Sequence, residues 1–230
     1  MEAALKGPEA ALETTLRGRE AALETYRRFR KISNHHAGQA LKRVPKALML
    51  ERAKRLGLLS KQKVLVAGSQ EELTLVFDLA IYSKRMARAT VIEMYRRSCD
   101  PERGSGEERV LEAMCDTRFK LLAVVRRHPE AGLVVRDLFT QEELWLMDES
   151  LEQSSQEDTA FAARVFQPGE FWMTTGGLVP LIPALILELV RDFPSPVQDK
   201  SLREGRNARF IEAVYKTAIA GGAMDRVAFG

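Results

Sequence analysis

Basic side chains crowd one early stretch of the chain, and their spacing gives the clearest chemical signal in the sequence. Residues 26–63, the basic stretch, hold twelve Lys or Arg against one acid, Glu51. Clustered cations release counterions from nucleic acid and bind it without sequence preference. We therefore expect a partner-binding surface here, for nucleic acid or for an acidic protein surface. The candidate binding residues are Arg27, Arg28, Arg30, Lys31, Lys42, Arg43, Lys46, Arg52, Lys54 and Arg55.

An acidic stretch lies much later in the chain. Residues 131–180 hold two Arg against nine acids. Opposite charges attract, so the basic stretch could instead complement this acidic region, within one chain or across a homo-oligomer. The sequence leaves both interpretations open, because it contains no recognised DNA-reading motif.

Groups that could carry out catalysis are few. Gly68 follows an apolar run and precedes a helix, but the further glycines and the lysine of a phosphate loop are missing. No G-x-S-x-G motif is present, and the two cysteines do not form a C-x-x-C pair. The sequence therefore favours a non-enzymatic binding module with no cofactor and no metal.

An enzyme whose site is assembled from distant residues is the second alternative. Its candidate residues are Asp78, His35 and Asp137. Asp78 is a lone carboxylate in the apolar segment LTLVFDLAIY. A hydrogen bond or ion pair on its own helix face is the simpler explanation for Asp78, and a turn is the simpler explanation for Asp137.

The elements that must position these residues are helical in the first half. The segment EAALET occurs twice, eleven residues apart, and predicts a helix with a weak point near Gly18. A break is expected at residues 33–36, and a second helix from Lys46. Ser69-x-x-Glu72 and Ser105-x-x-Glu108 are capping boxes. They predict helices from about Gln70 to about Ser98 and from Ser105 to about Cys115, and residues 63–67 predict a short β run.

Alternation with a period of two begins after Cys115. It predicts five antiparallel strands that form a meander or a small barrel, and Gly176-Gly177 is expected to leave the sheet. The fold class is therefore α+β and mostly helical. The expected strands are 119–126, 133–139, 142–148, 159–166 and 171–175.

Two helices are expected at the end of the chain, at residues 181–193 and 207–220, with Pro194-Ser195-Pro196 as a linker. The resulting organisation has three parts. Residues 1–116 form a helical region, 117–180 an antiparallel β module, and 181–230 C-terminal helices that pack on the rest.

The β region also carries a resemblance. GLVVRDLFTQEELWLMDESL (132–151) and FAARVFQPGEFWMTTGG (161–177) follow LVFDLAIY and FKLLAVV. Together these segments resemble uncharacterised bacterial proteins with a helical N-terminal part and a small β module. Some larger proteins of this kind carry a cysteine-rich SEC-C zinc tail, which this chain lacks. The resemblance implies a fold and no known activity.

The sequence predicts neither a secretory signal nor a membrane-spanning helix. The N-terminus has early acids and no basic region before an apolar core, which is untypical of a secretory signal. Residues 178–190, the longest apolar run, contain two prolines and are too short to cross a bilayer. With only two cysteines, the sequence predicts a cytoplasmic protein.

Overall fold

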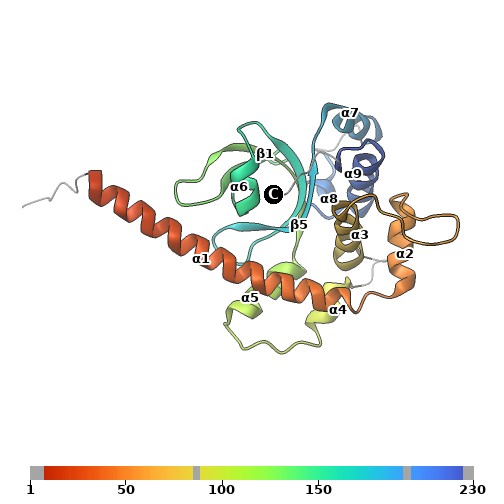
Figure 1. Cartoon of the computed structure of the whole chain (residues 1–230), viewed down its shortest axis with the longest axis horizontal. Helices are drawn as coiled ribbons and strands as arrows, with labels where there is room; N and C mark the ends of the chain where they lie inside the picture. Colours follow the sequence, from red (N-terminus) through yellow and green to blue (C-terminus); the bar gives the residue numbers. More distant parts are fainter. Residues whose placement is uncertain (1–7, 85–88, 194–197, 225–230) are drawn as a thin grey trace, which may run out of the picture.

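The chain begins with one long helix. The structure is a computed structural model that describes residues 8–84, 89–193 and 198–224. Helix α1 (Pro8–Leu41) runs for 34 residues without a break (Figure 1). The predicted break at residues 33–36 is wrong, because Ser33 donates to the Arg30 carbonyl 3.0 Å away and His36 packs inward against Tyr95. The helix also continues through Gly18.

Four shorter helices complete the described part of the first half. The predicted N-caps Ser69 and Ser105 are confirmed, since each hydroxyl accepts a hydrogen bond from the backbone N–H three residues further on. Gly57 follows the second helix in a left-handed conformation (φ 80°), as expected after a helix end. The helices are α2 (Lys46–Arg55), α3 (Gln70–Tyr82), α4 (Val91–Arg96) and α5 (Gly106–Cys115).

The prediction of one helix from Gln70 to Ser98 is wrong. Helix α3 ends at Tyr82, and Ser83 is extended (φ −94°, ψ 130°). A capping box then begins α4, because Thr90 accepts from the Glu93 N–H while the Glu93 carboxylate accepts from the Thr90 N–H. This pair satisfies N–H groups that only a helix start leaves without partners, so a new helix is favoured there.

Five strands form a closed sheet beside α1. Their order is β1-β2-β3-β5-β4, and β1 also pairs with β4. The α+β class and the five strands are thereby confirmed. The strands are β1 (Arg118–Arg127), β2 (Leu133–Asp137), β3 (Glu143–Met147), β4 (Ala160–Phe166) and β5 (Trp172–Pro180).

The expectation of purely antiparallel pairing is wrong at one place. β3 and β5 are parallel and pair through Leu146–Trp172 and Met147–Met173. Antiparallel neighbours must alternate in direction, and an odd number of strands cannot alternate all the way round a closed order. One parallel pair is therefore unavoidable in a closed sheet of five strands.

Gly176-Gly177 does not leave the sheet, because β5 continues to Pro180. The pairing of β4 with β5 shifts register between Ala163 and Val165, opposite these glycines. Gly176 has a φ of 110°, which an L side chain rarely adopts. Glycine within a strand often marks such an irregularity, so here the pair bends the strand and does not end it.

The remaining described helices follow β3 and β5. Asp148 caps α6 (Glu149–Ser154), and Asn207 caps the last helix. The prediction of a helix at residues 207–220 is thereby confirmed. The linker predicted at residues 194–196 lies outside the described residues. The last three helices are α7 (Pro183–Asp192), α8 (Lys200–Arg203) and α9 (Ala208–Ala220).

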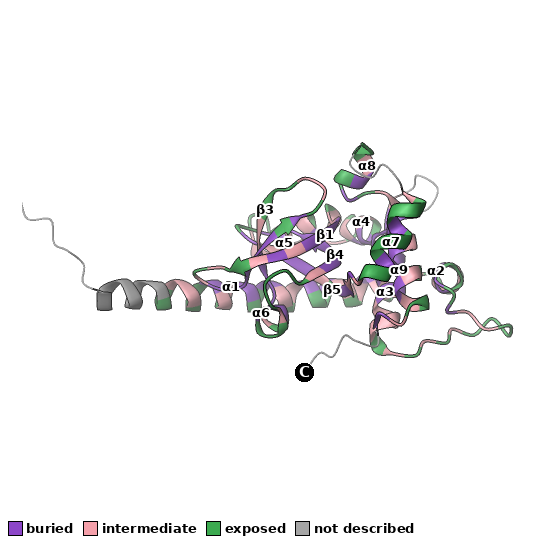
Figure 2. Ribbon diagram, turned by 90° about the horizontal axis from the view of Figure 1, so that it is seen from above, coloured by how far each residue is buried: buried purple, intermediate pink, exposed green. Residues whose placement is uncertain are grey.

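Apolar side chains pack in three clusters. One fills the inside of the closed sheet, around Leu122, Val135 and Val165. Another joins the outer face of the sheet to α2, α3, α7 and α9, and the third joins α1 to α3, α4 and α5. The burial pattern follows these contacts along each element (Figure 2). Within the described parts of the chain, no helix has the length and apolar character required to span a bilayer.

Candidate functional site

Part of the basic stretch is turned toward the β module. Arg27 lies 2.6 Å from Glu149, and Arg30 lies 3.3 Å from Asp148. Arg19, just before the stretch, lies 2.8 Å from Glu152. Residues 19 and 30 are eleven apart, about three helical turns, and therefore share one face of α1.

Arg30 is the most deeply held of these cations. It donates to the Thr174 carbonyl (2.6 Å) and to the Thr174 hydroxyl (3.2 Å) as well as to Asp148. Its guanidinium also lies 5.3 Å from the centre of the Tyr26 ring. Burial raises the pKa of Tyr26, although the nearby charge of Arg30 opposes this shift. Arg30 therefore fixes α1 to the sheet and is poorly placed for an external partner.

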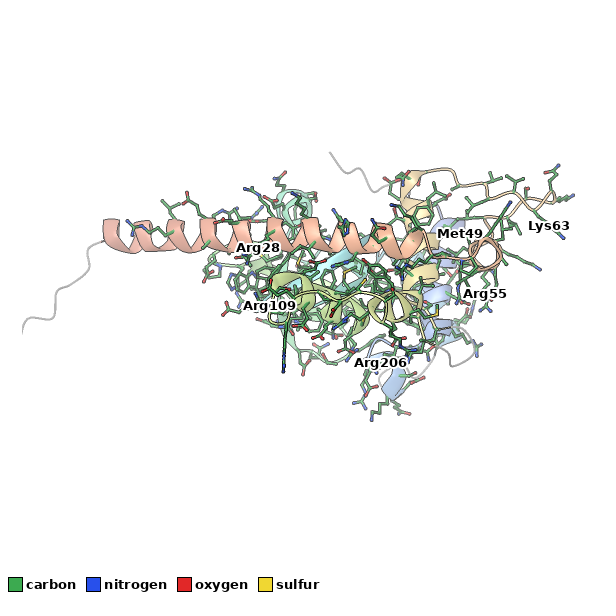
Figure 3. The ribbon with its side chains drawn as sticks, turned by 90° about the horizontal axis from the view of Figure 1, so that it is seen from below. Arg28, Met49, Arg55, Lys63, Arg109 and Arg206 are labelled. Carbon is green, nitrogen blue, oxygen red and sulfur yellow. The ribbon has the colours of Figure 1, made fainter. Side chains whose placement is uncertain are left out.

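Arg28 lines a groove of about 390 Å³ between α1 and the β module. Arg28 and Arg109 flank the ring of Phe29, with guanidinium carbons 5.5 and 5.8 Å from its centre. Figure 3 shows both arginines beside the middle of α1. Trp145 closes the groove and stacks on His128 at 4.0 Å.

Two arginines of α2 connect that helix to α9. Arg52 and Arg55 lie 3.1 and 2.9 Å from the same Glu212 carboxylate. Arg52 is buried, with 2% of its side chain exposed, whereas Arg55 is about half exposed and also pairs with Glu51. This geometry gives Arg52 a structural role.

Lys31 is exposed on α1, away from the other lysines of the basic stretch. The exposed cations of residues 42–63, Arg55 included, gather where α1 ends and α2 begins and continue into the loop after α2. Glu51 is the one acid in residues 42–63, and it pairs with Arg55. We call this surface the cationic end, and it comprises Lys42, Arg43, Lys46, Lys54, Arg55, Lys61 and Lys63.

Arg43 is held in place although it is exposed. Its guanidinium lies 4.7 Å from the centre of the Tyr95 ring, and it donates to the Ser98 hydroxyl. Burial is the largest cause that raises the pKa of Tyr95, to about 12, and the charge of Arg43 opposes it. Arg43 is thus oriented beside α4, whereas Lys42 and Lys46 lie on the open surface.

The predicted β run at residues 63–67 is part of a projecting hairpin. Leu59 and Leu65 form one antiparallel bridge, and Ser60 and Val64 are joined by a 2.9 Å backbone bond. Lys63 turns the chain in a left-handed conformation (φ 60°). Figure 2 shows the hairpin extending from the body of the molecule, and Figure 3 places Lys63 and Arg55 at the same end.

The three candidate catalytic residues lie in separate environments. Asp78 accepts from Arg164 (2.9 Å), Tyr215 (2.9 Å) and Thr175 (3.1 Å). Asp137 accepts from Lys120 and from the Phe139 backbone N–H, and His35 is exposed on α1. The two carboxylates are saturated by internal donors and the histidine lies apart from both, so their positions support structural roles.

The other reactive side chains give no stronger site. Burial raises the pKa of the Cys115 thiol to about 11, so it is not a thiolate at neutral pH. In residues 8–84, 89–193 and 198–224, no three or more His, Cys, Asp or Glu side chains are arranged to hold a metal ion.

Sequence reasoning missed Arg19, Arg109 and Arg164. Arg19 precedes the basic stretch, but its three-turn spacing from Arg30 is a signal that could have identified it. Arg109 and Arg164 are isolated cations whose neighbours come from distant parts of the chain. No local pattern marks such residues.

A model of a protein family, described as a family of unknown function (DUF7986), matches residues 20–221. The match covers the whole cationic end, the closed sheet and α9. No curated protein matches the chain, and no solved structure matches it.

Proposed function

We propose that this chain, which belongs to DUF7986, a family of unknown function, is a non-enzymatic module that binds nucleic acid through its cationic end. In this proposal the closed sheet serves as a small, rigid barrel that supports the helices. We also propose a cytoplasmic location and, from the resemblance in the sequence, a bacterial source.

The concentration of unneutralised positive charge carries this proposal. Seven exposed cations lie in residues 42–63, against Glu51 in the same stretch and Glu212 of α9. Exposed Lys and Arg side chains of this kind bind phosphates with little sequence preference, because the gain comes from counterion release. Three acids of the β module, Asp148, Glu149 and Glu152, are already engaged by Arg30, Arg27 and Arg19.

The hairpin supports a nucleic-acid partner in particular. Lys61 and Lys63 lie at its tip, and Val64 and Val66 are each 58% exposed beside them. A two-stranded ribbon is narrow enough to enter the major groove of DNA. The lysines could contact phosphates while the valines contact sugars or bases.

A triple variant, K54Q/K61Q/K63Q, tests the proposal. Binding of labelled single-stranded and duplex DNA should weaken, and the slope of log K against log salt should become shallower by about 2.7 for duplex DNA, at about 0.9 per lost phosphate contact. Fluorescence anisotropy across a salt series measures both quantities. The matched control is R126Q/R136Q/K200Q, which removes three exposed cations from β1, β2 and α8.

Three results would contradict the proposal. They are no DNA binding by the parent protein at low salt, equal losses in the two triple variants, and a change of oligomeric state in K54Q/K61Q/K63Q with no change in DNA binding. The last result would favour the competing hypothesis that basic surfaces mediate self-association. The ion pairs of Arg27 and Arg30 support a related hypothesis, in which those two cations bind the acidic β module within one chain and stabilise its fold.

A further inference from the structure

A polar cavity that shares no residue with the cationic end lies at the start of β1. Its volume is about 330 Å³, and it is lined by the end of α3, the start of α4, the start of β1 and the start of α9. A volume of this size is at the lower end of the range for small-molecule sites. Its polar lining side chains include Ser83, Thr90, Thr117, Arg118, Arg164 and Arg206.

Arg164 provides a buried hydrogen-bond donor in the lining. Only 3% of the residue is exposed, and its Nε is 2.9 Å from both Asp78 carboxylate oxygens. Its Nη2 has no hydrogen-bond partner. Asp78 already accepts from Tyr215 and Thr175, and Tyr82 covers the guanidinium at 5.5 Å. A buried guanidinium N–H without an acceptor is costly, so Arg164 leaves one unsatisfied donor directly behind the cavity lining.

Two arginines at the rim carry excess positive charge. Arg118 and Arg206 donate to the same carboxylate, that of Asp116, at 2.9 and 2.8 Å. One negative charge thus opposes two positive ones at the rim. The lining also contains exposed Lys84 and one further acid, Glu93, whose carboxylate accepts from the Thr90 N–H at 2.6 Å, so four cations face two acids in all. The charges that face the cavity therefore favour an anion.

The start of α9 adds the positive end of a helix to the lining. Ala208, the first residue of this 13-residue helix, lines the cavity, whereas the backbone N–H groups of Gly205 and Arg206 already donate to the carbonyls of Leu202 and Ser201. The N-terminus of a helix carries a partial positive charge and attracts anions. Gly205 holds this segment against β1, because its carbonyl accepts from the Phe119 N–H (3.0 Å).

From these contacts we propose that the cavity binds a small molecule that carries a phosphate group. The phosphate would lie between Arg118, Arg206 and the start of α9, with Arg164 behind it. Guanidinium groups bind phosphate through paired, charge-assisted hydrogen bonds, which are stronger than neutral ones. The rest of the ligand would contact Thr90, Thr117 and Tyr82.

Isothermal titration calorimetry with inorganic phosphate and pyrophosphate tests this site, in a buffer whose other anion is chloride. The parent protein should bind at least one of them, and R118Q/R206Q should bind it about tenfold more weakly or worse, because it loses two charge-assisted partners. The control R126Q/R136Q is closely matched, since those two exposed arginines also share one carboxylate, that of Glu143. Its phosphate affinity should not change.

A208D provides a variant whose fold should be preserved. An acid in the first turn of α9 is favourable for the helix, yet it would repel phosphate. Phosphate binding should be lost while the melting temperature stays the same or rises. K54Q/K61Q/K63Q should keep its phosphate affinity, which separates this site from DNA binding at the cationic end.

Four results would overturn the proposal. They are no binding of either probe at millimolar concentration, tighter binding of succinate or citrate than of the phosphates, equal losses in R118Q/R206Q and R126Q/R136Q, and phosphate binding that survives in A208D.

Discussion

At the scale of single residues, Asp78 is a buried carboxylate that connects four elements. It joins α3 to β4, β5 and α9 through Arg164, Thr175 and Tyr215. The sequence marked Asp78 as unusual but suggested a partner on its own helix. The actual partners lie 86, 97 and 137 residues away, and pairing over such distances leaves no periodic trace in one sequence.

Replacing Asp78 should therefore be strongly destabilising. D78A leaves the buried Arg164 without its counter-ion, and the expected loss in the free energy of unfolding is about 3–5 kcal/mol. Urea denaturation followed by circular dichroism measures this loss. The control D192A breaks the exposed pair with Arg191 and should cost about 1 kcal/mol or less. Similar losses in the two variants would argue against a structural role for Asp78.

His36 should make the stability depend on pH. Its Nδ1 lies 2.9 Å from the Tyr95 hydroxyl, and burial, its largest influence, lowers its pKa although Glu107 opposes the shift. The unfolded chain, with an ordinary histidine pKa of about 6.5, therefore binds the proton more tightly than the folded chain. Stability is fully present above the unfolded pKa and falls as the pH drops from there toward the folded value.

The neighbouring histidine gives the control for this prediction. H36Q should reduce the loss of melting temperature between neutral and mildly acidic pH, whereas H35Q should leave it unchanged, because His35 is exposed on the same helix. His128, whose pKa is also lowered by burial, remains in both variants and contributes equally to each. An unchanged pH profile in H36Q would refute the prediction.

At the scale of elements, local signals predicted local structure well. The N-caps Ser69 and Ser105, the end of α2 and the final helix were all correct, because capping depends on residues within one turn. The parallel pair β3–β5 and the extension of β5 past Gly176 were not predicted. Both depend on how the sheet closes, and that property arises only when all five strands are assembled.

Gly205 shows how one position can align two elements. It has a φ of 65°, and a Cβ there would overlap the backbone of Phe119. G205A should lower the free energy of unfolding by about 1–2 kcal/mol for the left-handed conformation and by about 1–3 kcal/mol more for the overlap. G104A is the control, since its φ is 76° and a Cβ would meet nothing within 4 Å.

Chemical denaturation of the two glycine variants isolates the packing contribution. G104A should show only the conformational cost of about 1–2 kcal/mol. If G205A is no less stable than G104A, the tight contact between this segment and β1 is not needed for the fold.

At the scale of the whole molecule, the sequence predicted an uneven charge distribution. It could not predict which cations form internal ion pairs and which are exposed to a partner. Arg27 and Arg30 meet the acids that follow β3, and buried Arg52 meets Glu212. The exposed cations of residues 42–63 form the cationic end, and among them Arg55 also pairs with Glu212. Composition alone cannot make this division, since it depends on which face of each helix meets a neighbour. The candidate binding surface is accordingly smaller than the basic stretch.

The parallel pair between β3 and β5 also gives the closed sheet a seam. Only two residue pairs join these strands, whereas β1 and β4 are joined by six. Arg30 spans that seam from outside, since it holds Thr174 of β5 and also Asp148, the residue directly after β3. Helix α1 therefore stabilises the closure of the sheet. A closed sheet of five strands must contain one parallel pair, and here Arg30 of α1 links the two strands of that pair from outside.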